Sequence, residues 1–390
     1  MAAPFRRKAS RGAQNNISKS PESIIDKRMQ EYNNETTRLV THNASLDNER
    51  IRTKRQRLKF IVASIYILSG ATQPLLMTLV KSAGLADKTC QLYMLAYYFG
   101  PSLLFFHLFN STISFKVFGK VACIAVIDIF AQSLNYTGAA LAGPTLFTII
   151  YSSVTIWTAV YSRCMIGRKL NFFQWIGIFV VFIGLAVTAT DSVSIGPDIF
   201  HGALLVIFGS SMHAMTYVLS EAIMGPSSHR ISVEVNCAIQ GLIAFTVYST
   251  WQIIYTRPRF QELVKEPMEE SGTSPLKAIL ILLSLSFSNL IHAYSFFYTL
   301  NNFPGGATSA GVMKGVQAVL VFIFSAFIYC GRMGGEEMCF SMSKFISLMI
   351  VIIGMLTFSA STDGILAHSK SITLEETEIP IISEEAKGAV

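Results

Sequence analysis

The feature that most constrains this chain is a succession of long apolar runs, which fills residues 59–361 and is broken only by short polar segments. The hydrocarbon core of a bilayer is about 30 Å thick, and an α-helix crosses it with roughly 20 apolar residues. Several runs reach that length. Only 14% of the residues are charged, well below the roughly 25% of an ordinary soluble domain. The sequence therefore predicts an all-α polytopic membrane protein.

The apolar runs predict about ten transmembrane helices, at 59–80, 91–109, 117–138, 144–162, 172–190, 199–221, 232–255, 277–300, 306–330 and 343–361. Residues 1–58 are polar and have few large apolar side chains. We expect them to form a disordered cytosolic tail that is helical only close to the membrane. Residues 362–390 are expected to form an acidic cytosolic C-terminal tail.

A cluster of basic residues immediately before the first run indicates the orientation of the chain. It consists of Arg50, Arg52, Lys54, Arg55, Arg57 and Lys59. Such a cluster is typical either of a nucleic-acid patch or of a cytosolic anchor facing anionic lipid. Because it adjoins a membrane span, we favour the lipid anchor and expect no nucleic-acid partner. An even number of spans then places both termini in the cytosol, and the first span serves as the insertion signal, since no apolar signal-peptide region lies near Met1.

Sequence motifs of enzymes and metal sites are absent. The six cysteines are dispersed without a CxxC pair, so we expect packing residues and neither a disulfide framework nor a zinc site. No metal-binding histidine spacing, glycine-rich phosphate loop or nucleophile elbow is found. The sequence thus predicts no catalytic activity, no metal and no cofactor.

Two segments of the chain resemble each other. Residues 172–187 align without a gap on 342–357, so that Gly184 meets Gly354, and a Gly-Arg pair precedes each segment, at 167–168 and at 331–332. The similarity is either a coincidence of apolar sequence or an internal repeat, and the matched order favours a repeat. The repeat units are then 59–190 and 199–361. An odd number of spans gives the units opposite orientations, an arrangement that in many transporters places the substrate site between them.

With these motifs the chain resembles the drug/metabolite transporter superfamily. The resemblance covers roughly 59–361 and depends on the number of spans, the two Gly-Arg pairs and the sequence QWIGIFVVFIGL. The ninth span, GGATSAGVMKGVQAVLVFIFSAFIYCGR, is similar to the corresponding helix of the nucleotide-sugar and triose-phosphate translocator branch, solute carrier family 35.

The resemblance implies ten helices in two inverted repeats and exchange of a nucleotide sugar for a nucleoside monophosphate in Golgi or endoplasmic-reticulum membrane. The partners that it implies are a small-molecule substrate and the bilayer, and a homodimer is left open. One departure is that several phosphate-handling members have a second basic residue in the fourth span, whereas TLFTIIYSSVTIWTAVY has none. A less charged metabolite therefore stays open as the substrate.

Lys314 is the strongest candidate for substrate binding. It lies eight residues after Gly306, roughly 12 Å along a helix and so near the middle of the membrane. An ammonium group at that depth costs about 3 kcal/mol on insertion scales, which favours either a polar cavity or a structural partner. We predict that it attracts an anionic group of the substrate.

Polar side chains near Lys314 on the ninth span extend this hypothesis. Gln317 shares its helical face and is a candidate hydrogen-bonding partner of the substrate. Gly311 and Gly315 form a GxxxG motif, which we interpret as a site of close helix packing.

Four other spans contribute candidate substrate-binding residues, which are Tyr151, Gln132, Asn135, Asn289, His292 and Tyr217. For each, a purely structural contact is the alternative. Asp128 lies on the stripe of Gln132 and Asn135 and is predicted either to bind a proton or to be the counter-ion of Lys314. A structural Asp–Lys pair is an equal competitor.

The sequence as a whole predicts a secondary transporter that moves a small metabolite, preferably anionic, by alternating access or exchange. A carrier of a neutral or cationic metabolite or drug with the same fold is the first alternative. A membrane receptor or scaffold that transports nothing is the second. Replacement of Lys314 separates them, because a scaffold loses stability and a carrier loses transport.

Overall fold

The computed structural model describes residues 21–142, 153–187, 197–224 and 230–332, together with Phe147, Ile150, Tyr151 and part of 339–361. The predicted C-terminal tail 362–390 lies outside the described residues. Within the described part the regular structure is helical, apart from one isolated β-bridge between Met224 and Ile231. Residues up to Leu58 form one unit and the chain from Lys59 onward forms another.

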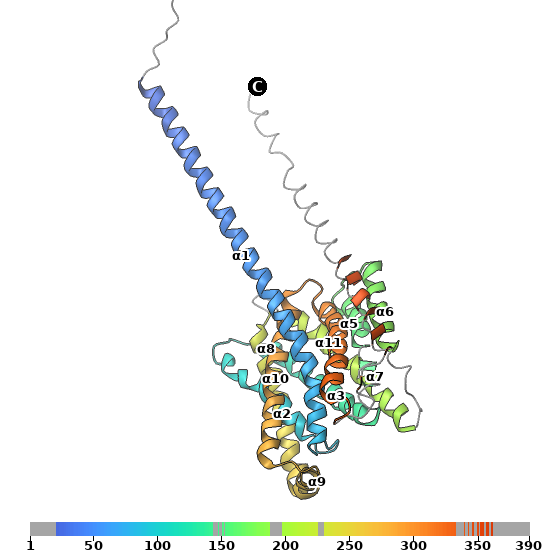
Figure 1. Ribbon diagram of the computed structural model, residues 1–390. Helices are drawn as coiled ribbons and strands as arrows, with labels where there is room; N and C mark the ends of the chain where they lie inside the picture. The colour runs from blue at the N-terminus through green and yellow to red at the C-terminus, as the bar shows by residue number, and fades with distance from the viewer. Residues whose placement is uncertain are drawn as a thin grey trace, which may run out of the picture. The chain divides into compact units, whose positions relative to one another are not determined.

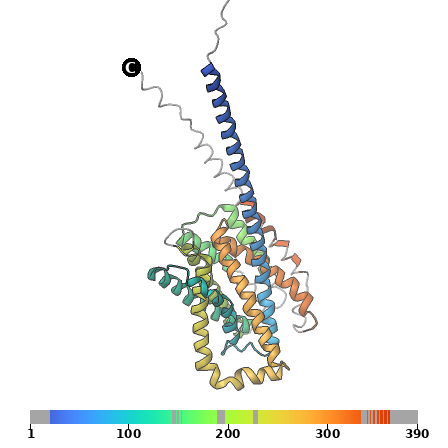
Figure 2. The ribbon, with the colours of Figure 1, turned by 90° about the vertical axis from the view of Figure 1, so that its left-hand side faces the viewer.

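The helices of the second unit run side by side as a bundle (Figures 1 and 2). The helices are α1 (Pro21–Ser82), α2 (Leu92–Ser102), η1 (Leu103–Leu108), α3 (Phe115–Ala142), α5 (Val154–Met165), α6 (Phe172–Val187), α7 (Pro197–Ile223), α8 (Val233–Trp251), α9 (Glu266–Glu270), α10 (Pro275–Asn302) and α11 (Gly306–Tyr329). Short π and 3-10 segments, η3 (Gln252–Thr256), η4 (Arg257–Arg259) and η5 (Gln261–Lys265), connect α8 to α9. Helical turns also recur at the described positions of 342–361.

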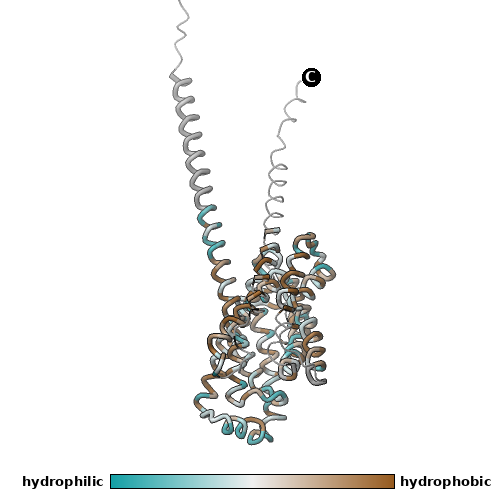
Figure 3. The backbone as a smooth tube through the Cα atoms, turned by 45° about the vertical axis from the view of Figure 1, so that its right-hand side comes forward, coloured by the Kyte–Doolittle hydropathy of each residue, from teal (hydrophilic) through white to brown (hydrophobic). Residues whose placement is uncertain are grey.

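Six of the described helices are long and apolar enough to cross a membrane, namely Glu49–Ser82, Phe115–Ala139, Phe200–Ile223, Val233–Arg259, Pro275–Asn302 and Gly306–Tyr329. Two shorter apolar helices, Leu92–Leu108 and Phe172–Gly184, accompany them. Large apolar side chains point outward, as a lipid environment requires; Phe115 is 88% exposed. Figure 3 shows hydrophobic residues along the bundle helices and hydrophilic residues around α9. The prediction of an all-α membrane protein is thus confirmed, whereas ten spans and an inverted repeat stay predictions.

Helix α1 extends the N-terminal structure well beyond the expectation from the sequence. The tail 1–58 was expected to be mostly disordered, with a helix close to the membrane, and the helix begins as early as Pro21 and continues to Ser82. Proline is well tolerated in the first turn of a helix, and neither glycine nor a second proline occurs between Pro21 and Gly70. Without these helix breakers, polar residues alone do not interrupt the helix. The side chains from Glu49 to Leu58 are exposed.

Glycines allow α3 and α7 to approach closely. A methyl group at Gly138 would lie 2.7 Å from the carbonyl oxygen of Gly202, and one at Gly209 would lie 2.4 Å from Oδ1 of Asn135. Both distances are shorter than van der Waals contact, so only glycine fits at these positions. This close packing fixes the relative position of α3 and α7, which carry Asp128 and His213.

The cysteines differ from the expectation in one respect. Cys330 and Cys339 form a disulfide, although the sequence analysis interpreted all six cysteines as packing residues. Gly331 has a φ of 69°, a left-handed conformation that suits glycine and ends α11. The chain then returns until the two Cα atoms are 4.6 Å apart, which is within the range that a disulfide spans. Cys90 and Cys237 are buried free thiols.

Candidate functional site

The bundle encloses a cavity of about 740 Å³. Side chains from α1, α2, α3, α7, α8, α10 and α11 line it. The volume lies in the range of small-molecule sites, roughly 300–1,000 Å³. The cavity is thus large enough for a metabolite of the size of a nucleotide.

Lys314 of α11 points into this cavity. Its Nζ lies 3.2 Å from Nε2 of His292, 5.7 Å from the ring centroid of Tyr66 and 6.0 Å from that of Tyr151. Among the described residues, no carboxylate forms an ion pair with Lys314. A nitrogen lone pair and two aromatic faces stabilise a cation but leave its charge uncompensated.

A chain of hydrogen bonds orients His292 toward Lys314. The hydroxyl of Ser69 donates to the carbonyl oxygen of Tyr66, so its oxygen accepts from Nδ1 of His292, 3.1 Å away. With the proton on Nδ1, Nε2 is free to accept from the Lys314 ammonium group, which can only donate. The His292 ring also stacks on Tyr66, with 5.1 Å between centroids. The contacts thus assign a neutral His292, protonated on Nδ1, that accepts from Lys314.

Amide side chains form a neutral polar wall of the cavity. Gln73 Nε2 donates to Asn289 Oδ1 over 2.9 Å, and Asn289 Nδ2 donates to the carbonyl oxygen of Tyr97 over 2.7 Å. Gln317 Nε2 donates to the carbonyl oxygen of Tyr66 over 2.9 Å. These bonds fix the amides in place, so they present hydrogen-bonding groups without a net charge.

Asp128 of α3 contacts two other helices. Its Oδ1 lies 2.8 Å from Nδ1 of His213 on α7, and its Oδ2 accepts from the hydroxyl of Tyr98 on α2 over 2.7 Å. The predicted pairing of Asp128 with Lys314 does not occur among the described contacts, because Asp128 is engaged by His213 and Lys314 by His292. The ring of Tyr151 lies 6.1 Å from the His213 ring and 6.0 Å from Nζ of Lys314.

Most of the residues predicted for the site line the cavity. They are Lys314, Gln317, Tyr151, Gln132, Asn289, His292, Tyr217 and Asp128. Asn135 does not: it is 1% exposed and packs against Gly209 between α3 and α7. Gly311 packs on α5, where its carbonyl oxygen accepts from Thr155 over 2.9 Å, and Gly315 is buried.

Sequence reasoning did not identify some of the polar groups in the cavity. Neither Tyr98 nor Gln73 was among the residues predicted for the site. The signal for Gln73 was a polar side chain in the middle of an apolar run. For Tyr98 no such signal exists, because a tyrosine in a membrane helix is most often a packing residue.

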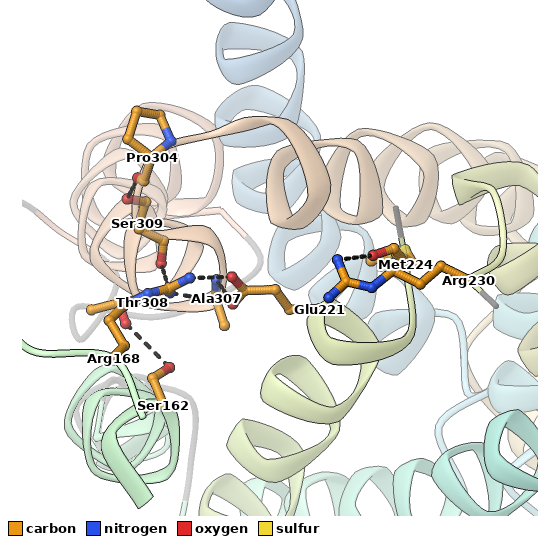
Figure 4. A network of polar contacts seen from close by, with 10 residues as sticks. Ser162, Arg168, Glu221, Met224, Arg230, Pro304, Ala307, Thr308 and Ser309 are labelled. Atoms are coloured by element: carbon orange, nitrogen blue, oxygen red, sulfur yellow. Dashed lines mark hydrogen bonds and ion pairs between the residues drawn. The ribbon is translucent and has the colours of Figure 1, made fainter. Parts of the chain in front are cut away.

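An ion pair lies where α5 and α7 end and α11 begins (Figure 4). Arg168 pairs with Glu221 and also donates to the carbonyl oxygen of Gly305. Glu221 accepts from the backbone N–H of Ala307 over 2.7 Å, in the first turn of α11. The Glu221 side chain is partly buried, because three helix ends meet there.

The same junction requires glycine at the start of α11. Gly305 and Gly306 have φ angles of 87° and 46°, which favour glycine. A methyl group at Gly306 would lie 2.0 Å from Oε1 of Glu221. The tight connection at these two glycines therefore allows Glu221 to reach the start of α11.

Comparison with known proteins relates the chain to membrane transporters. Residues 58–190 match the EamA-like transporter family. Solute carrier family 35 member F6 of Homo sapiens is 24% identical over 254 residues, which span 59% of this chain and 63% of the human protein. The protein of the same name from Rattus norvegicus is 24% identical over 225 residues, 52% of this chain and 57% of its own length. The resemblance found from the sequence is thus confirmed.

A solved structure described only as a crystal structure of a protein has a similar fold. It superposes with a TM-score of 0.59 at 13% identity and covers 79% of this chain and 99% of its own. At that identity the similarity shows the fold alone.

Proposed function

We propose that this chain, a member of the drug/metabolite transporter superfamily related to solute carrier family 35, is a secondary carrier of a small anionic metabolite, either a nucleotide sugar or another phosphorylated compound. The observation that carries the proposal is Lys314, a cavity-lining cation without a carboxylate partner among the described residues. An uncompensated ammonium group within a membrane protein is costly. Binding an anion removes that cost, so the cavity favours anionic solutes.

The remainder of the cavity suits the other parts of such a substrate. The ring of Tyr151 lies 6.0 Å from Nζ of Lys314, and Tyr151 and Tyr217 both line the cavity, as do the hydrogen-bonded amides of Gln73 and Asn289. A base or a sugar ring packs on aromatic faces, and its polar groups pair with amides. A negative charge at one end and a polar ring at the other therefore match the lining.

The two ends of the cavity differ, and alternating access accounts for the difference. Lys81, Ser82 and Ala86, at and beyond the end of α1, contribute to its lining, whereas at the junction of α5, α7 and α11 the helix ends are tied together by Arg168 and Glu221. We propose that the tied end faces the cytosol, together with both chain termini, and that the other end faces the lumen of the Golgi or the endoplasmic reticulum. Transport then requires the Arg168–Glu221 junction to open.

Exchange by the purified full-length chain in liposomes tests this function. The liposomes contain nucleoside monophosphates, and labelled nucleotide sugars are offered outside. We expect saturable uptake that depends on the internal monophosphate and falls at least about tenfold in Lys314→Gln, since a tenfold change corresponds to 1.4 kcal/mol. Lys277→Gln is the matched control, because Lys277 lies in the first turn of α10 and is exposed.

A carrier of neutral or cationic solutes is the second candidate, and Asp128 favours it. The carboxylate lines the cavity beside Tyr98, and Tyr97 and Tyr136 are close by. Aromatic rings around a carboxylate are suited to an organic cation. Uptake of a labelled organic cation that is lost in Asp128→Asn and unaffected in Lys314→Gln would select this candidate over the anion carrier.

A further inference from the structure

Asp128 is an acid placed far from either end of a membrane helix. It lies about 20 Å along α3 from Phe115, at about 1.5 Å per residue. Its side chain and that of His213 are 15% and 10% exposed, and both line the cavity. Ionisable residues inside a membrane are costly unless they serve a pathway for a substrate or a proton. The pair is therefore reachable from the cavity while most of its surface is shielded.

We propose that Asp128 and His213 together form a proton-binding site, and that one proton crosses the membrane with each anionic substrate. The inference rests on the proposed carrier function and adds the coupling ion to it. The ligand of the site is the proton, and Lys314 remains the site for the anion. The two are separate positions in one cavity.

The charge of the pair changes by one unit when it binds a proton. With Asp128 ionised and His213 neutral the pair carries a charge of −1. A proton taken from cavity water brings it to zero, whichever of the two side chains holds it. On the opposite side of the membrane the proton returns to water and the charge of −1 is restored.

The environment of the pair contains mostly groups that are neutral. Facing Asp128 from α2, α3, the segment before α5, α7 and α8 are Tyr97, Tyr98, Tyr136, Tyr151, His213 and Tyr248. His292 of α10 lies within electrostatic range of His213, and Nζ of Lys314 on α11 lies 6.0 Å from the Tyr151 ring. Since the tyrosines are hydrogen-bonding groups without charge, protonation of the pair determines the net charge on this side of the cavity.

This charge sets the direction of coupling. When the pair is deprotonated, its negative charge repels an anionic substrate in the same cavity and offsets the attraction of Lys314. Protonation removes the repulsion, so the anion and the proton bind best together. The geometry thus favours symport of a proton with the anion.

The pair also connects the parts of the chain that must move. Asp128 and Tyr98 belong to the first predicted repeat and His213 to the second. Two helices of the first repeat and one helix of the second therefore meet at the carboxylate of Asp128. A protonated carboxyl group donates one hydrogen bond and loses an acceptor site. Proton binding therefore changes the contact between α3 and α7, whose close packing depends on Gly138 and Gly209.

Infrared titration of the purified full-length chain tests proton binding without any substrate. We expect a carboxyl band that appears on acidification, is missing in Asp128→Asn and shifts along the pH axis in His213→Gln. Glu234→Gln is the matched control, because Glu234 also accepts from a tyrosine, Tyr294, over 3.1 Å but does not line the cavity. A spectrum of Asp128→Asn that equals the wild-type spectrum across the titration overturns the proton site.

Transport then tests the coupling. Proteoliposomes without internal monophosphate are given a labelled nucleotide sugar, and its net uptake with an acidic exterior is divided by its net uptake at equal pH. Exchange is avoided here, because a proton that leaves with the monophosphate would cancel the proton that enters with the sugar. We expect a ratio severalfold above one for wild type and Glu234→Gln, and a ratio near one for Asp128→Asn and His213→Gln. A ratio of one in the wild type overturns the coupling. If no sugar is exchanged at all, the carrier function is what fails, and the infrared titration still decides the proton site.

Discussion

The carboxylate of Glu221 pairs with the guanidinium group of Arg168 and also accepts a hydrogen bond from the backbone N–H of Ala307 in the first turn of α11. Three helix ends are therefore joined by one side chain. The Arg168 and Glu221 side chains are 22% and 14% exposed, so breaking the pair costs less than the roughly 3–5 kcal/mol of a fully buried one. This cost is small enough for a carrier to overcome during a transport cycle.

Reversing the charge of either partner is expected to open this end of the cavity. Arg168→Glu and Glu221→Arg each place like charges together, and the double exchange restores the pair but not the bond to Ala307. In vesicles, a cysteine in place of Ser220, which lines the cavity, is labelled by an impermeant thiol reagent. Cys123 and Cys164, which are exposed, and Cys237, which lines the same cavity, are first replaced by serine. We expect faster labelling in both single variants and partial recovery in the double variant. Labelling rates in the two single variants that equal the rate with the Arg168–Glu221 pair intact would contradict a closed end at this junction.

Replacing Lys314 with glutamine is expected to separate stability from transport. A neutral amide avoids most of the cost of an ammonium group in the membrane, about 3 kcal/mol, while it still donates to His292. The melting temperature of the purified variant should therefore equal or exceed that of the wild type although uptake is lost. A large fall in melting temperature would indicate the receptor or scaffold alternative, in which Lys314 only holds helices together.

The loop between α1 and α2 should lose stability in acid. Burial opposes ionisation of Asp87, but hydrogen bonds from Thr89 and Cys90 outweigh it and lower the pKa of this carboxyl group. The folded pKa of Asp87 lies below its unfolded value of about 3.9. The ionised carboxylate therefore stabilises the folded state at pH values above the unfolded pKa, and this stabilisation is lost as the pH falls through the folded pKa. We expect Asp87→Asn to cost about 1 kcal/mol near neutral pH and to abolish this acid-dependent part of the loss. Thermal unfolding measured against pH checks the difference, and parallel curves would contradict it.

The disulfide between Cys330 and Cys339 gives an independent test of orientation. Disulfides persist in oxidising compartments, so we expect this loop in the lumen, opposite the two termini. After reduction, an impermeant alkylating reagent should reach the two thiols from the lumenal side only. Cys330→Ser with Cys339→Ser should lower stability by about 2 to 3 kcal/mol for a loop of this length. Labelling from the cytosolic side would reverse the proposed topology.

Features that depend on a single helix could be predicted from the sequence, whereas contacts between several helices could not. Polar residues at helical spacing on a single span identified Asp128 with Gln132, and Lys314 with Gln317, as cavity residues. The partners could not be predicted, because the rotations of α3, α7 and α11 about their axes decide that Asp128 meets His213 rather than Lys314. Asn135 continues the stripe of Asp128 but is buried, since Gly209 lets α7 approach at that level.

Long-range contacts also explain the remaining differences. Nothing local to Glu221 indicates that Arg168 and the start of α11 lie beside it. The disulfide likewise depends on the turn at Gly331, which brings together two cysteines that are nine residues apart. The long N-terminal helix is different, because the lack of glycine and proline between Pro21 and Gly70 was a local signal that the polar composition of this segment concealed.

A backbone crossing between distant parts of the chain has a consequence for its evolution. A methyl group at Gly177 of α6 would lie 2.8 Å from the carbonyl oxygen of Gly354, and one at Gly354 would lie 2.9 Å from that of Gly177. A larger residue at either position cannot be compensated by a smaller one at the other, since nothing is smaller than glycine. Mutational drift is therefore blocked at both positions at once, and the lineage of this protein should retain the two glycines even where every surrounding apolar residue has been exchanged.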